Sequence, residues 1–145
     1  MLRFTLFIAS LLMILGGEVT ATRVFHEKLE QVLTAQTPVI LARVQSIRQV
    51  TEPDAVRLFI RLDSIQVIHL RGPDGDEVVH VLSTNLEREI NGRVVRVSPI
   101  LEGSGLERNL QVGTHYYFLL DTSGNYIRRV EPNNSGPAIR KILGI

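Results

Sequence analysis

The chain contains no cysteine and no tryptophan, and its only lysines are Lys28 and Lys141. The absence of cysteine excludes disulfide bonds, thiolate zinc sites, a cysteine nucleophile and a lipid anchor on an N-terminal cysteine. The absence of tryptophan argues against a site that stacks on sugar rings. Acidic and basic residues nearly balance, at a net charge of +1, which gives no reason to expect a nucleic acid or an anionic membrane as partner.

Long apolar runs are also scarce, and the one near the N-terminus is short. Phe4–Leu15 follows the basic Arg3, and small residues occupy the last positions up to and including Ala21. A membrane-spanning helix needs about 20 apolar residues, whereas a short run with a basic start is typical of a secretory signal. We predict that residues 1–21 are a signal peptide cleaved after Ala21, and that the protein is periplasmic or secreted and meets the membrane only through this peptide. The alternative is an uncleaved N-terminal membrane anchor.

The stretch Val56–Leu70 is the longest strand-like segment of the chain. Apolar residues alternate with polar or aromatic ones from Val56 to Leu62, which indicates a half-buried strand. After Ser64 the apolar positions move to the opposite parity. A β-bulge near Asp63–Ser64 would absorb this shift and bend the strand. A strand this long and broken in phase suits a small barrel better than a flat sheet.

The rest of residues 22–145 is predicted to form one domain with this strand. Residues 22–36 carry apolar side chains at helical spacing and are predicted to be an amphipathic helix that ends before Thr37-Pro38. The barrel strands fall within residues 38–130, with a hairpin turn at Asn91-Gly92. Residues 131–145 form a C-terminal tail, either a helical turn or an edge strand. The strands are predicted over residues 38–50, 56–70, 77–84, 93–100, 115–121 and 126–130.

Three segments in order resemble a known family. Pro38–Val44, Leu62–Gly72 and Leu110–Leu120 are similar to the opening strand, the long strand and a late strand of secreted OB-like barrels of the netrin-module and tissue-inhibitor-of-metalloproteinases type. In particular, the chain resembles cysteine-free bacterial relatives of unknown function. It departs from the pattern at Ala42, where glycine is usual. It also lacks the N-terminal cysteine through which the animal inhibitors bind zinc, so that mechanism is not implied here.

Strand pattern and resemblance together predict an all-β fold: a small OB-like β-barrel of five to seven strands with one N-terminal capping helix. The alternative is an open β-sandwich with the same strands. A face of such a barrel that carries basic and aromatic residues is where strands and oligosaccharides bind. The candidate ligand-binding residues on this face are Arg43, Arg57, Phe59 and Arg61. The alternative is a solvated outer face on which the arginines form cross-strand ion pairs.

Catalytic and metal chemistry have little support in the sequence. His69, His80 and His115 are weak metal candidates, because no two histidines have the close spacing of a local ligand motif. No nucleophile and base can be paired, so we predict neither an enzyme nor a cofactor. We predict an exported, non-enzymatic binding module of the bacterial cell envelope whose partner is another envelope protein or a surface polymer. The alternatives are a protease inhibitor that acts through the loop Leu101–Asn109, and a metal-dependent accessory enzyme.

Overall fold

The computed structural model describes residues 28–53, 55–84, 86–97 and 106–145. The predicted signal peptide and the first part of the predicted N-terminal helix lie outside these ranges. No helix within them is both long and apolar enough to cross a bilayer.

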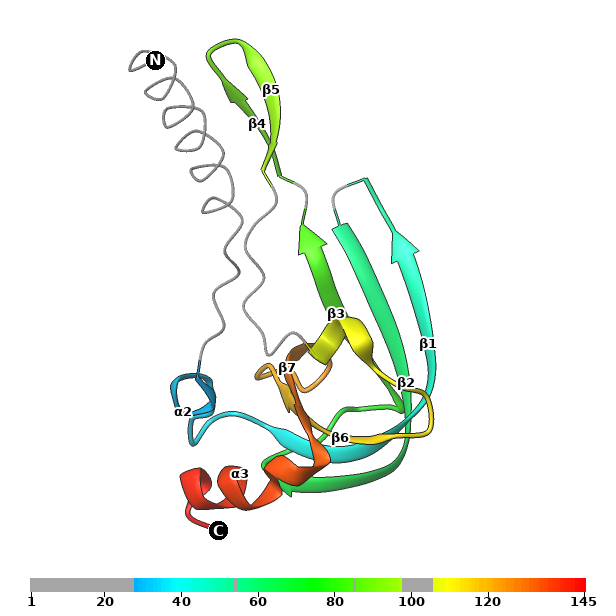
Figure 1. Cartoon of the computed structure of the whole chain (residues 1–145), viewed down its shortest axis with the longest axis vertical. Helices are drawn as coiled ribbons and strands as arrows, with labels where there is room; N and C mark the ends of the chain where they lie inside the picture. Colours follow the sequence, from blue (N-terminus) through cyan, green and yellow to red (C-terminus); the bar gives the residue numbers. More distant parts are fainter. Residues whose placement is uncertain (1–27, 54, 85, 98–105) are drawn as a thin grey trace, which may run out of the picture.

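The described chain is mostly β, as predicted, and its main element is a five-stranded antiparallel sheet (Figure 1). The strand order is β3-β2-β1-β6-β7. A separate two-stranded hairpin, β4–β5, extends away from this sheet in the view of Figure 1. The strands are β1 (Val39–Thr51), β2 (Ala55–His69), β3 (Glu77–Thr84), β4 (Leu86–Ile90), β5 (Arg93–Val97), β6 (His115–Leu120) and β7 (Ile127–Pro132).

The long strand β2 has the predicted irregularity. Leu41 pairs with Gln66 and Arg43 with Asp63, so β2 has one more residue than β1 between these two pairs. Ser64 takes a φ of 51°, a left-handed conformation that is uncommon for residues other than glycine. The bulge predicted at Asp63–Ser64 is therefore confirmed. The extra residue in β2 accounts for the shift of the apolar positions after Ser64.

One isolated bridge links β3 to the chain just before β7. Residues 39–43 of β1 pair with β2 on one side and with β6 on the other. At the far edges, Val79 of β3 forms a parallel bridge with Tyr126, immediately before β7. The Val79 N–H donates to the carbonyl of Asn125 at 3.0 Å. This bridge connects β3, at one end of the pairing order, with the residue that precedes β7, the strand at the other end.

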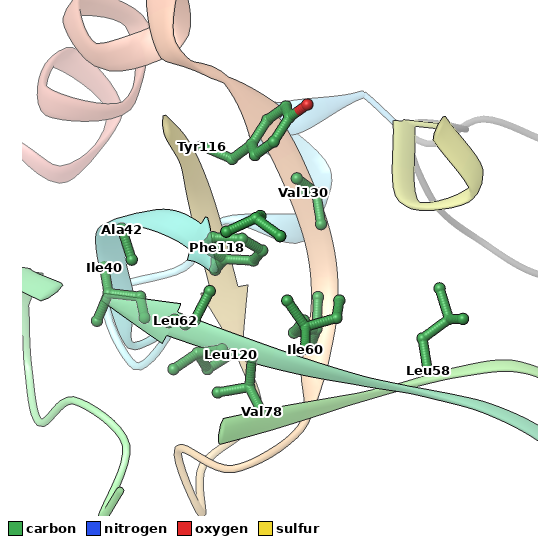
Figure 2. Packing of buried hydrophobic residues seen from close by; sticks show 12 residues of the cluster. Ile40, Ala42, Leu58, Ile60, Leu62, Val78, Tyr116, Phe118, Leu120 and Val130 are labelled. Atoms are coloured by element: carbon green, nitrogen blue, oxygen red, sulfur yellow. The ribbon is translucent and has the colours of Figure 1, made fainter. Parts of the chain in front are cut away.

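The main core lies on the concave side of the curled sheet (Figure 2). Ile40, Ile60 and Phe118 are fully buried there, and the rings of Tyr116 and Phe118 meet edge to face at a centroid distance of 6.2 Å. Each buried side chain of this size stabilises the fold by about 1.5–3 kcal/mol relative to exposure. Alternate residues of β1, β2 and β6 supply this core, as the period-2 pattern requires.

A second apolar cluster covers the opposite face of β1 and β6. Val39, Tyr117 and Leu119 pack there against the helices α2 (Leu29–Val32) and α3 (Gly136–Leu143). Of the predicted C-terminal tail, residues 131 and 132 belong to the end of β7, and residues 136–143 form a helix rather than an edge strand. α3 ends at Gly144, which takes a φ of 71° and donates its N–H to the last helical carbonyls.

The predicted N-terminal helix is wrong in its C-terminal bound, because α2 ends at Val32 and not at Gln36. Leu33 is extended and buried against the sheet. A turn follows in which the Thr34 N–H donates to the Thr37 hydroxyl at 3.0 Å. This turn leads the chain directly into β1, which leaves no room for a further helical turn. The helix packs on the outer face of the sheet rather than over one end of it.

The hairpin β4–β5 turns at the predicted Asn-Gly pair. Asn91 and Gly92 have φ angles of 53° and 74°, both positive as a type I′ turn requires. β5 ends at Val97, and the last predicted residues of this strand, 98–100, lie outside the described residues.

Candidate functional site

The four residues of the predicted binding face lie on the outer surface of the β1–β2 hairpin. Arg57, Phe59 and Arg61 alternate along β2 with the buried Leu58 and Ile60, so they point away from the core. Arg43 stands on the neighbouring strand β1 and is exposed. The structure therefore places all four on one side of the hairpin.

Each of the three candidate arginines has a carboxylate partner. Arg43 donates to Asp63 at 2.7 Å, and Arg57 donates to Glu52 at 2.7 Å. Arg61 lies 3.5 Å from Asp76. The guanidinium of Arg43 donates to the carboxylate of Asp63 and holds its pKa below the usual value. The three candidate arginines are thus neutralised by acidic neighbours, and such exposed pairs contribute little to stability.

The ring of Phe59 stacks against an arginine side chain. The guanidinium carbon of Arg48 lies 4.4 Å from the centroid of the Phe59 ring, on the neighbouring strand. This cation–π contact covers part of the ring and holds Arg48 flat on the sheet.

The three candidate histidines lie in different places. His69 pairs with Val39 on one side of β1, and His115 pairs with Arg43 on the other side, four residues or about 13 Å further along β1. His69 contacts the carbonyl of Ala35 at 2.8 Å. His80 is buried on the core side of β3. Among the residues that the structure describes, no group of three or more potential metal ligands gathers.

An apolar pocket opens beside the core, at the end of the hairpin near the β1–β2 turn. It has a volume of about 350 Å³. In Figure 2, Leu58 stands apart from the other core residues, on the side where the short helix η1 (Leu106–Asn109) crosses the view. Cross-strand pairing places Gln49 opposite Leu58, on the same face of the sheet. The residues lining the pocket are Gln49, Val56, Leu58, Leu82 and Arg108.

Buried polar groups lie next to this pocket. Glu107 is 4 % exposed and accepts the N–H of Val130 at 3.0 Å. His80 is buried and its Nδ1 lies 3.3 Å from the carbonyl of Ile127. Burial lowers the pKa of His80 and the nearby Arg108 adds to this, while the carbonyl and Glu107 oppose it. The net effect lowers the pKa of His80, so its imidazole favours the neutral form. The positive charge beside the pocket is therefore that of Arg108.

A second candidate site is the part of β2 that continues past the end of its pairing with β3. β3 pairs with β2 only from Ala55 to Arg61, whereas β1 follows β2 as far as His69. The segment Ser64–Leu70, which we call the β2 edge, therefore has a strand partner on one side only among the described residues. It contains no charged residue. Its exposed apolar side chains are Ile65, Val67 and Leu70, at 37 %, 51 % and 49 %.

A cavity of about 550 Å³ adjoins the end of the β2 edge. The residues lining this cavity are Ala35, Gln36, Pro38, Leu70, Arg71 and Thr122.

Sequence reasoning missed both the pocket and the β2 edge as sites. The loop Leu101–Asn109 has no strand pattern, and only its last four residues are described, as η1. Leu106 and Leu110 both pack against the core, and their four-residue spacing is the one signal that could have indicated an anchored turn. The free edge could not have been inferred, because it depends on where β3 ends relative to β2.

Comparisons with protein-family models, with curated proteins and with solved structures found no match.

Proposed function

We propose that this chain is an exported, non-enzymatic binding module of the bacterial cell envelope, and that it binds an extended segment of another envelope protein along the β2 edge. The fold we propose for it is an OB-like barrel of the kind that the netrin-module resemblance implies. The strand order and the bridge between Val79 and Tyr126 support a barrel over an open sandwich, because two separate sheets do not require their outer strands to meet.

The observation that carries the function is the uncharged, half-exposed β2 edge. Soluble proteins usually protect such an edge with charges, proline or a covering element. Ser64–Leu70 has neither a charge nor a proline. Gly72 of the following turn lies against Val67, and Val67 and Leu70 are nevertheless about half exposed. An added strand would pair with the backbone of the edge, and alternate side chains would meet Ile65 and Val67.

This surface favours a protein over a polysaccharide as the partner. A strand edge presents N–H and C=O groups at the repeat of another polypeptide, which a sugar chain does not match. The outer arginine face, the main candidate for a polymer, is neutralised by Glu52, Asp63 and Asp76. The absence of charge on the β2 edge indicates that the partner segment is likewise neutral, with apolar residues at every second position.

A random peptide library displayed on phage tests this proposal, because it samples extended segments of every composition. The mature chain is the bait, and binders are counter-selected with Val67→Lys, which places a charge on the edge. We expect neutral peptides with alternating apolar residues. These peptides should protect the amides of residues 64–69 from hydrogen exchange and should lose at least about tenfold in affinity for Val67→Lys.

Val112→Lys is the matched control, because Val112 is 63 % exposed on a loop outside the β2 edge. Peptides that bind both variants equally, or that protect other amides, would contradict the assignment of the site. Light scattering on the purified protein tests whether a second copy of the chain binds the β2 edge instead. A dimer that is lost in Val67→Lys would overturn the proposed partner. Export is checked by intact mass, for which we expect a periplasmic form that begins at Thr22.

A further inference from the structure

The pocket beside η1 combines an apolar floor with the guanidinium of Arg108. Val56, Leu58 and Leu82 come from β2 and β3 and supply its apolar lining. Gln49 of β1 and Arg108 of η1 supply the polar groups. A volume of about 350 Å³ falls at the lower end of the range for small-molecule sites, about 300–1,000 Å³.

The charge of Arg108 has no carboxylate partner within the described part of the chain. Arg43, Arg57 and Arg61 each have one. The residue before Arg108 in the chain, Glu107, is buried and its carboxylate accepts the N–H of Val130. The neighbouring His80 favours its neutral form. A guanidinium at the margin of an apolar pocket is thus left to bind an anion from solution.

We propose that this pocket binds a small amphipathic anion, a carboxylate with an apolar chain. The chain would lie on Leu58 and Leu82, where it removes apolar surface from water at both partners. The carboxylate would accept hydrogen bonds from the guanidinium of Arg108, which suits the planar geometry of a carboxylate. The amide of Gln49 can donate to the same group. This site is separate from the β2 edge and does not depend on the proposed protein partner.

Sodium decanoate, kept below its micellar concentration, is the probe, and decanol is the uncharged control. Titration into the isotopically labelled mature protein should give saturable shifts confined to the methyl groups of Val56, Leu58 and Leu82 and to the Arg108 side chain. We expect decanol to bind about tenfold more weakly. We expect Arg108→Gln to lose about tenfold in affinity for decanoate and most of the preference for decanoate over decanol.

Arg128→Gln is the matched control, because Arg128 is also an exposed arginine but lies on β7 and does not line the pocket. It should bind decanoate as the wild type does. Gln49→Phe, which adds bulk to the pocket margin, should weaken binding of both probes. The proposal is overturned if decanoate shows no saturable binding or if Arg108→Gln binds it as tightly as Arg128→Gln. It is also overturned if residues 98–105 contact Leu58 in the free protein, since the chain itself would then fill the pocket.

Discussion

Replacement of Gly136 by alanine tests whether α3 is fixed on the sheet as closely as the structure places it. A Cβ at residue 136 would lie 2.5 Å from the Tyr117 hydroxyl oxygen and 3.1 Å from Cζ of the same ring. Gly136 is buried, and Tyr117 is only 6 % exposed within the second apolar cluster. Neither group can move without displacing the start of α3 or the ring.

The expected cost follows from overpacking, which in a filled core typically costs about 1–3 kcal/mol. Residue 136 stands before Pro137 with φ and ψ of −50° and −51°, a helical conformation that a Cβ disfavours before proline. Helix propensity therefore offsets none of this cost, and we expect Gly136→Ala to lower the free energy of unfolding by about 1–3 kcal/mol. Urea denaturation of the mature chain measures this value.

Gly75→Ala is the matched control, since a Cβ there meets nothing within 4 Å. It should be neutral or stabilise by up to about 1 kcal/mol through the unfolded chain. Tyr117→Phe removes the closest atom, so it should recover part of the loss in a Gly136→Ala background while changing the wild type little. Equal stabilities of Gly136→Ala and Gly75→Ala would refute the close docking of α3.

Two further predictions concern backbone strain and pH, and urea denaturation measures both. Ser64→Val should lower the free energy of unfolding by about 1–2 kcal/mol, because a β-branched residue is unfavourable at a φ of 51°, whereas Ser64→Gly should lose less than half of that. The pKa of His80 is lowered mainly by burial, so below a pH of about 6.5 the unfolded chain takes up the proton first. The free energy of unfolding should therefore fall from pH 7 to pH 5. An equally steep fall with pH in His80→Gln would count against His80 as the cause.

The sequence predicted the local features because each depends on neighbours along the chain. The alternation from Val56 to Leu62 and the change of phase after Ser64 together require a long, bulged strand, and both are present. The Asn91-Gly92 pair specifies a two-residue hairpin turn because both residues tolerate positive φ. The bound of α2 was mispredicted, since helical spacing continues through Leu33 while burial of that residue against the sheet ends the helix at Val32.

Tertiary structure alone decided which surfaces are available. The pairing of Arg43, Arg57 and Arg61 with carboxylates depends on strand register and on turns that place Glu52 and Asp76 beside them. The β2 edge lacks a partner strand because β3 pairs only as far as Arg61, and no pattern within Ser64–Leu70 carries that information. The pocket likewise depends on where η1 places Arg108 relative to Leu58. Periodicity determines which side of a strand is apolar, but only the folded chain determines what covers that side.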